Sequence, residues 1–393
     1  MSEAVFIVGA ARTAIGSFGG SLAGHTPAAL GALVTREALK RAGLAPGDVG
    51  HVVFGNVIPT EPHDAYLGRV AAVQAEIPVS VPALTLNRLC GSGVQAIVSA
   101  AQSIMLGDAD TAVAGGAEVM SRAPHYLTVG RFGQRLGDTT MLDGLTGVLT
   151  DPFGNGIMGI TAENVADAYG ISREDQDAFA AESQRRAGAA RAAGHFTDQI
   201  LPVEVTRGRN QIVFDADEYP KPETTVESLA KLPTVFRKGG SVTAGNASGI
   251  NDGAAAIALA SERHVRAAGL QPLARIVGYA HAGVEPGLMG IGPIPAVKAL
   301  LQRTGLSIGD FDVIESNEAF AAQALAVSRD LGMDPEITNP DGGAIALGHP
   351  VGATGAILTV KTVSHLRRTG GRYGLVTMCI GGGQGIALAV ERL

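Results

Sequence analysis

The chain has 393 residues, which exceeds the size of one ordinary hydrophobic core and predicts two or three packed domains. Hydrophobic residues make up 46% and charged residues 17%, a composition typical of a compact folded protein rather than a disordered one. The formal net charge of -7 argues against nucleic acid or an anionic membrane as partner, because either would require a basic face.

Only two cysteines occur, Cys90 and Cys379, so no disulfide framework is expected. The stretch MSEAVFIVGAARTAIG lacks the basic start and long apolar run of a secretory signal. No apolar run reaches the roughly 18 residues that a membrane span needs. No cysteine or histidine spacing typical of a metal site is present. We therefore expect a cytoplasmic protein with free thiols and no metal.

Strand and helix patterns alternate along the first part of the chain. AVFIVGAARTAIG begins as a buried strand, and PAALGALVTREALKRAG (27–43) has helical spacing and stops at a glycine. HVVFGNV is a short strand, a helical face runs from Val94 to Met105, and TAVAGGAEVM is a strand. This alternation predicts an α/β fold.

The middle of the chain, residues 121–249, has few strand signals, and we interpret it as an inserted loop domain. It contains a long predicted helix, SREDQDAFAAESQRRAGAARAAG, whose start has a capping-box pattern at Ser172 and Asp175. The α/β pattern occupies 1–120 before it and 250–393 after it, and 250–270 is expected to complete the N-terminal half. One later predicted helix, NEAFAAQALAVSRDLG, begins at Asn317.

The two α/β parts resemble each other. RAGLAPGDVGHVVFGNV (41–57) matches RTGLSIGDFDVIESNEA (303–319) in its helix end, its Gly-Asp turn and its strand. Each is followed by a glycine-rich helix start and by a strand ending in glycines, VAGGAE and CIGGGQG. Three correspondences in the same order favour duplication.

Each cysteine allows two interpretations. Cys90, in NRLCGSG, stands at a predicted helix N-terminus, where free N–H groups and the helix dipole would lower its pKa and make it a nucleophile. A free cysteine can equally be a small buried hydrophobe. Cys379 ends an apolar strand before several glycines, which is consistent with a ligand site or with simple packing.

His349 and Asn317 are also ambiguous when taken alone. His349, in LGHPVGATG, is held extended by Pro350 before a predicted helix, and it could be reactive or merely bonded to backbone. Asn317, in IESNEAF, stands at a strand-to-helix junction, where it could be a helix N-cap or a functional group.

Taken together, the motifs resemble those of the thiolase family over nearly the whole chain. NRLCGSGVQAI, TAENVA, TAGNASGINDGAAA, NEAFAAQA, GGAIALGHPVGATGA and MCIGGGQGIA have the order and spacing of thiolases. The sequence is most similar to bacterial acetyl-CoA acetyltransferases and β-ketothiolases. The resemblance implies two similar halves packed in five layers, α-β-α-β-α, with an inserted loop domain. It also implies a homotetramer, with the tetramerisation loop at 131–142.

The resemblance implies a reversible Claisen condensation of acetyl-CoA with acyl-CoA, and thiolysis of 3-oxoacyl-CoA. Cys90 would carry the acyl group, His349 would accept its proton, and Cys379 would remove a proton from acetyl-CoA. His349 and a water on Asn317 would form one oxyanion hole, and the N–H groups of Cys90 and Gly381 a second. Coenzyme A thioesters would be substrates, and no cofactor is expected.

The resemblance also assigns a binding site for the thioester. Ser248 would contact the pantetheine arm, and Leu149, Met158, Met289 and Phe320 would line the tunnel. A basic group comprising Lys221, Lys231, Arg237 and Lys238 could hold the nucleotide, although Pro233 replaces an arginine found in many relatives. Ile157 stands where short-chain biosynthetic thiolases commonly have histidine. We expect it near the thioester, favouring longer apolar acyl chains.

The sequence disfavours three other classes of protein. A decarboxylating ketoacyl synthase typically has histidine where this chain has Cys379. A non-catalytic acyl-CoA-binding protein of the same fold would be expected to have lost some of the four reactive residues. A dinucleotide-binding oxidoreductase would require G-x-G-x-x-G, which IVGAARTAIGSFGG lacks.

Overall fold

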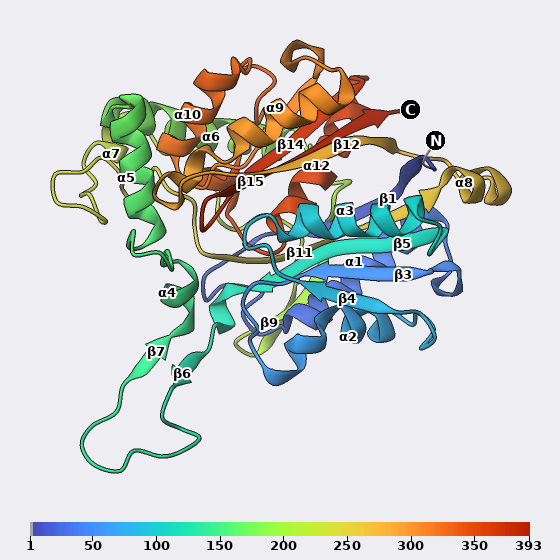
Figure 1. The fold of residues 1–393 in the computed structure, drawn as a ribbon, viewed down its shortest axis with the longest axis horizontal. Helices are drawn as coiled ribbons and strands as arrows, with labels where there is room; N and C mark the ends of the chain where they lie inside the picture. The colour runs from blue at the N-terminus through green and yellow to red at the C-terminus, as the bar shows by residue number, and fades with distance from the viewer. Residues whose placement is uncertain (1–2) are drawn as a thin grey trace.

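The computed structural model describes residues 3–393, and its centre is a large mixed sheet built from two similar halves (Figure 1). The first half has the strand order β3-β5-β11-β1, extended at its edge by β4, and the second half has the order β13-β14-β15-β12. The strands of the first half are β1 (Val5–Thr13), β3 (His51–Gly55), β4 (Ala83–Leu86), β5 (Thr111–Val119) and β11 (Asn251–Ser261). Those of the second are β12 (Ala274–Gly283), β13 (Val313–Ser316), β14 (Tyr373–Ile380) and β15 (Gln384–Arg392).

The pairing pattern confirms the duplication. In each half one parallel pair, β3 with β5 or β13 with β14, is followed by antiparallel partners. Irregularities occur at corresponding places, between Ile7 and Gly9 in β1 and between Ile276 and Gly278 in β12. Among residues 3–393, the half-sheets pair with each other only between β1 and β12, at Phe6 and Ile7. The shared bulge fixes which residue of one half corresponds to which residue of the other.

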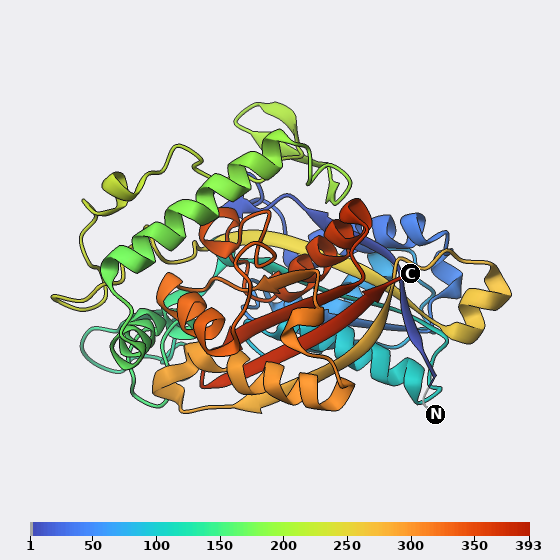
Figure 2. The same ribbon diagram turned by 90° about the horizontal axis from the view of Figure 1, so that it is seen from above.

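Helices form three layers around the two half-sheets (Figure 2). The first half is covered outside by α1 (Pro27–Ala42) and α2 (Leu67–Gln74), and the second half by α9 (Pro293–Thr304). Between the half-sheets lie α3 (Ser92–Met105) and α12 (Thr354–Thr369). These two helices cross at Gly93 and Gly355, where an added Cβ would come within 2.5 Å of the opposing backbone. Glycine there permits the close approach that seats both helix N-termini at one place.

The segment between β5 and β11 forms the loop region. It contains α4 (Gly144–Val148), α5 (Met158–Tyr169), α6 (Arg173–Ala192), α7 (Val226–Leu229), β6 (His125–Leu127), β7 (Met141–Asp143), β8 (Ile200–Leu201), β9 (Val203–Arg207) and β10 (Asn210–Phe214). The chain between β6 and β7 extends away from the rest of the molecule (Figure 1). The remaining elements are β2 (Gly16–Ser17), α8 (Glu262–Ala268), α10 (Ala321–Leu331) and α11 (Ala344–Leu347).

Two local predictions need correction. The helix predicted from Asn317 begins at Ala321 as α10, because Phe320 pairs with Ala247 of the loop region and the Ala321 N–H donates to the Asn246 carbonyl. Ser172 does cap α6 by accepting the N–H of Asp175 at 3.0 Å, but it does so without the reciprocal bond of a capping box. Over the described part of the chain, no helix combines the length and apolar character needed to cross a membrane.

Candidate active site

A mainly apolar cavity of about 70 Å³ lies where the N-terminus of α3, the end of β14 and the loop region meet. Its walls come from both halves of the fold and from the loop region. They are formed by Val57, Leu89, Cys90, Val148, Leu149, Met158, Ser248, Met289, Ala319, Phe320, His349, Val351, Cys379 and Gly381. Three of the four reactive residues expected from the sequence therefore share one cavity, and the fourth, Asn317, contacts His349.

A tight turn presents Cys90 to this cavity. Leu89 has a left-handed backbone with φ of 46°, an uncommon conformation for a residue with a side chain. The Ser92 hydroxyl closes the turn by accepting the Arg88 N–H at 2.8 Å and donating to the Leu89 carbonyl at 2.7 Å. Backbone strain held by such contacts often accompanies a functional position. The turn places the thiol just before the first residue of α3.

The electrostatics of Cys90 correct the expectation of a thiolate at rest. Burial raises the pKa of the Cys90 thiol to about 11, and the nearby carboxylate of Glu118 also raises it. The backbone N–H groups of Gly381 and of Cys90 itself lower it, but by less than burial raises it. Loss of water around the sulfur therefore outweighs the helix N-terminus. Cys90 is therefore a thiol near pH 7 and needs a base when it reacts.

His349 is held by backbone and side-chain contacts on both sides. The backbone N–H of His349 donates to Asn251 Oδ1 at 3.0 Å. The preceding Gly348 has φ of 105°, and an added Cβ would lie 2.4 Å from the Asn251 side chain, so only glycine fits there. These contacts orient the histidine into the cavity.

The tautomer of His349 follows from its neighbour Thr354. The Thr354 hydroxyl donates to the Pro350 carbonyl at 2.9 Å and lies 2.7 Å from His349 Nδ1. Because that hydroxyl has one proton, Nδ1 must carry the proton in this second bond, which leaves Nε2 with its lone pair. Burial lowers the pKa of His349 to about 4. The imidazole is therefore neutral near pH 7, with Nε2 available as a base.

Cys379 and Asn317 complete the group. Cys379 lies near the end of β14, paired in register with Gly385, and is fully buried. Burial, and then the neighbouring Cys90, raise the pKa of the Cys379 thiol far above its usual range. Asn317 donates its backbone N–H to Thr377 at 3.0 Å, and its Nδ2 lies 3.5 Å from His349 Nε2. Asn317 is therefore not a helix cap.

Most of the expected binding residues line the cavity, and two do not. Ser248, Leu149, Met158, Met289 and Phe320 contribute to the wall. Ile157 is not among the wall residues: it precedes the first residue of α5 and pairs with Thr150 in a β-bridge, whereas its neighbour Met158 lines the wall as expected. Lys221 is also outside, exposed, with its Nζ 5.7 Å from the centre of the Tyr219 ring.

The expected basic group is not a free cluster. Arg237 pairs with Asp167 at 2.7 Å and with Glu163 at 3.4 Å, so its guanidinium is already neutralised. Lys231 and Lys238 are exposed.

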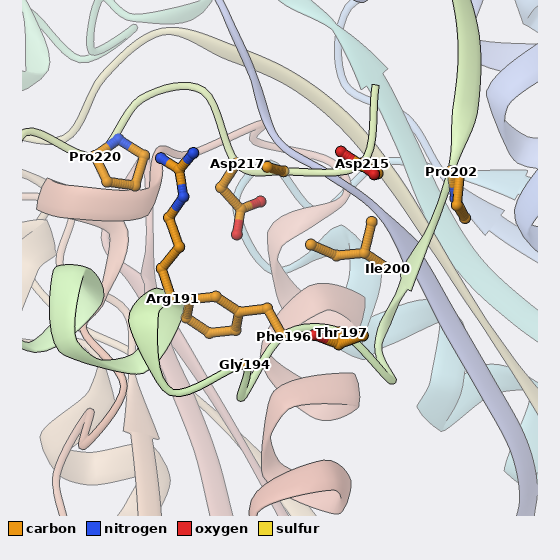
Figure 3. Close-up of a pocket in the computed structure, with 10 residues that line it drawn as sticks. Arg191, Gly194, Phe196, Thr197, Ile200, Pro202, Asp215, Asp217 and Pro220 are labelled. Carbon is orange, nitrogen blue, oxygen red and sulfur yellow. The ribbon is translucent and has the colours of Figure 1, made fainter. Parts of the chain in front are cut away.

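A second cavity, of about 270 Å³, lies near the C-terminal end of α6 (Figure 3). Arg191, Phe196 and Asp217 are among the residues that line it. Asp217 is fully engaged: it accepts two bonds from buried Arg12, at 2.7 and 3.0 Å, and the Ile15 N–H. This larger cavity has no thiol or imidazole in its lining, so it is a poor candidate for the chemistry expected from the sequence.

Sequence reasoning missed two groups that orient His349. Thr354 lies within the motif HPVGATG, five residues after the histidine, and Asn251 begins β11. The spacing of Thr354 was a detectable signal, because a residue in the first turn of a helix can bond back to the segment before it. Nothing local to Asn251 indicates its long-range contact.

Comparisons with known proteins agree with this site. The family model "Thiolase, N-terminal domain" matches residues 5–263, and "Thiolase, C-terminal domain" matches residues 270–392. The chain is 58% identical to the beta-ketothiolase BktB of Cupriavidus necator, covering 100% of both chains. It is 51% identical to an acetyl-CoA acetyltransferase of Pseudomonas aeruginosa, covering 99% of both.

Solved structures show the same fold. Human mitochondrial 3-ketoacyl-CoA thiolase superposes with a TM-score of 0.97 at 46% identity, covering 99% of each chain. The Bacillus anthracis acetyl-CoA acetyltransferase also gives 0.97 at 46% identity, covering 100% of this chain and 99% of that one. Family models spanning nearly the whole chain, close relatives at full length and the matching fold lead to one conclusion: the chain belongs to the thiolase family and is an acyltransferase.

Proposed function

We propose that this thiolase condenses acetyl-CoA with a second acyl-CoA, and cleaves 3-oxoacyl-CoA in reverse, through an acyl group carried on Cys90. The observation that carries the proposal is the shared cavity of two thiols and a neutral imidazole of fixed tautomer. A thiol nucleophile with an adjacent base is the arrangement that covalent acyl transfer requires.

In the first half-reaction, His349 Nε2 takes the proton of Cys90 as the sulfur attacks the thioester carbonyl. The N–H groups of Cys90 and Gly381 stabilise the developing oxyanion, as they stabilise negative charge on the Cys90 sulfur. Coenzyme A leaves as a thiolate and takes the proton of Cys379, whose raised pKa keeps it a thiol until then. The enzyme now holds an acyl group on Cys90, an imidazolium and a Cys379 thiolate.

In the second half-reaction, the Cys379 thiolate removes a proton from the methyl group of acetyl-CoA. Imidazolium at His349, with a water held by Asn317, stabilises the enolate oxygen. The carbanion attacks the acyl group and expels Cys90 as a thiolate, which regains its proton from His349. Every proton is returned, so the proposed cycle needs no cofactor beyond its coenzyme A substrates.

Binding and cellular context form part of the same proposal. Ser248, whose N–H donates to the Ala319 carbonyl at 3.0 Å, is suited to contact the pantetheine arm beside the cavity. The chemistry needs both cysteines as reduced thiols, which supports a cytoplasmic location. Acyl chain length is the least constrained feature, because the cavity wall is apolar and offers few polar contacts.

We also infer a homotetramer. The segment between β6 and β7 extends from the molecule and exposes several large apolar side chains: Phe132 and Leu136 are 93% and 89% exposed, and Met141 and Leu142 are more than half exposed. Exposed apolar residues on one arm are typical of an interface. Sedimentation equilibrium of the protein and of a Phe132→Ser, Leu136→Ser variant tests this inference. A tetrameric variant would contradict it.

The catalytic proposal is tested with three proteins and three measurements. Incubation with acetyl-CoA alone should place one acetyl group on Cys90, seen by peptide mass, and Cys90→Ala should abolish turnover. Cys379→Ala should still be acylated but should no longer exchange the methyl protons of acetyl-CoA with deuterated water. Wild-type exchange in Cys379→Ala would assign the base elsewhere.

A further inference from the structure

Glu118, near the end of β5, is a fully buried carboxylate outside the group of reactive residues. Its two oxygens accept four hydrogen bonds. Oε1 accepts the Asn56 side-chain amide and the Ile58 N–H, each at 3.0 Å. Oε2 accepts the N–H groups of Val57 and Gly352, each at 2.9 Å. All four partners donate, so the site is built for a negative charge.

These bonds join two loops that form the walls of the catalytic cavity. The first loop follows β3 and contributes Val57. The second runs from His349 to Gly352 and contributes both His349 and Val351. The Glu118 carboxylate therefore holds the loop of His349 against the loop of Val57, because its Oε2 accepts one N–H from each loop. A displacement of either loop would change the position of the imidazole relative to Cys90.

The duplicated half shows that the fold does not require a carboxylate at this position. The matching bulges in β1 and β12 align β5 with β14 so that Glu118 corresponds to Ile380. Ile380 is equally buried and packs against Gly91 at the start of α3. An apolar side chain thus fills the position in the other half. A buried charge is costly to desolvate, so its presence here needs a reason other than packing.

Glu118 also acts electrostatically on the nucleophile. Its charge contributes to raising the pKa of the Cys90 thiol, which is also faced by His349 and Cys379. Burial raises the pKa of Glu118 itself to about 8, although the backbone N–H groups of Ile58, Val57 and Gly352 lower it, and the Asp64 carboxylate also raises it. Glu118 is therefore mostly ionised only above about pH 8, the range in which thiol alkylation is measured. Removing the Glu118 charge should therefore make the Cys90 thiolate easier to form.

We propose that Glu118 is a positioning residue for acyl transfer, because it holds the His349 loop against the Val57 loop. This inference rests on the proposed roles of Cys90 and His349. Loss of the Glu118 charge should change two reactions of the Cys90 sulfur in opposite directions: alkylation should become faster and acylation slower. That opposition separates the proposal from a purely structural role, which would lower both rates together.

The test compares Cys90 alkylation with Cys90 acylation in Glu118→Gln. Alkylation by iodoacetamide at about pH 9 needs only the thiolate, so it should become several-fold faster. Single-turnover acylation by acetyl-CoA needs His349 in place, so it should slow by about tenfold to a hundredfold. Glu315→Gln is the matched control: Glu315 is also fully buried but bonds Lys361, so this variant should lose stability without faster alkylation.

Slower or unchanged alkylation in Glu118→Gln, or the same pair of changes in Glu315→Gln, would overturn the proposal. If Glu118→Gln does not fold, Asn56→Ala removes one donor and keeps the charge. It should slow acylation several-fold at an unchanged alkylation rate, and an unchanged acylation rate would count against the proposal. Failure of the catalytic scheme is distinguishable, because it would leave wild-type Cys90 alkylated by iodoacetamide but never acylated.

Discussion

The fixed tautomer of His349 makes a sharp prediction for Thr354→Val. Valine has nearly the shape of threonine but cannot accept the proton of His349 Nδ1, which now bonds Thr354 Oγ1 at 2.7 Å. A buried donor without a partner costs about 1–3 kcal/mol. Since about 1.4 kcal/mol corresponds to tenfold in rate, acylation of Cys90 should slow by roughly fivefold to a hundredfold. The loss arises because the imidazole can now populate the tautomer whose Nε2 carries the proton.

The measurement is single-turnover acylation by acetyl-CoA, with thermal unfolding followed in parallel. Thr359→Val is the control, since Thr359 is buried on the same helix and donates only to the Gly355 carbonyl at 2.9 Å. Both variants should lose similar stability, but only Thr354→Val should lose acylation. Equal acylation rates in the two variants would refute the assignment of the tautomer.

Three further predictions follow from particular contacts. Asp217→Asn should lower the free energy of unfolding by about 3–5 kcal/mol, because it leaves the buried guanidinium of Arg12 without its partner; a loss below about 1 kcal/mol in chemical denaturation would contradict this. The lowered pKa of His349 means that the unfolded chain binds a proton more readily, so stability should fall as pH drops from about 6.5 towards 4, by about 3 kcal/mol in total; His349→Gln should show a shallower acid slope. Met158→Ala should raise kcat/KM for six-carbon over four-carbon 3-oxoacyl-CoA by about fourfold per added methylene, whereas Ile157→His, outside the cavity wall, should leave that ratio unchanged.

Short-range sequence patterns predicted the helices and strands whose conformation depends on residues close together in the chain. The helix start after Cys90, the helical face that follows it and the repeated strand-helix units are short-range patterns, and the fold contains them. The sign of the Cys90 pKa shift could not be predicted, because it depends on burial by Met158, Met289 and other distant segments. The side chain that the segment around Ile157 turns to the cavity was also beyond local sequence, because it depends on the bridge between Ile157 and Thr150.

The duplication raises the question of why only one of two related positions became a reactive site. Under the alignment fixed by the bulges and by the Gly93–Gly355 crossing, the counterparts of the reactive residues lack thiol and imidazole groups: Gly352 for Cys90, Asn87 for His349, Gly55 for Asn317 and Ala117 for Cys379. The connections at the sheet ends also differ. Between β5 and β11 the chain makes the whole loop region, whereas between β14 and β15 it makes a turn of residues 381–383.

That difference in connection gives a physical reason for the asymmetry. The long loop region supplies Leu149, Met158 and Ser248 to the wall beside Cys90, so this side can exclude water and hold a thioester. Around Gly352, the counterpart of Cys90, the turn of residues 381–383 offers no such cover. The space there is closed by the hydrogen bonds of Glu118 with Val57 and Gly352. The helix N-termini of α3 and α12 therefore meet in similar settings, and only the one beside Cys90 has a cavity covered by the loop region.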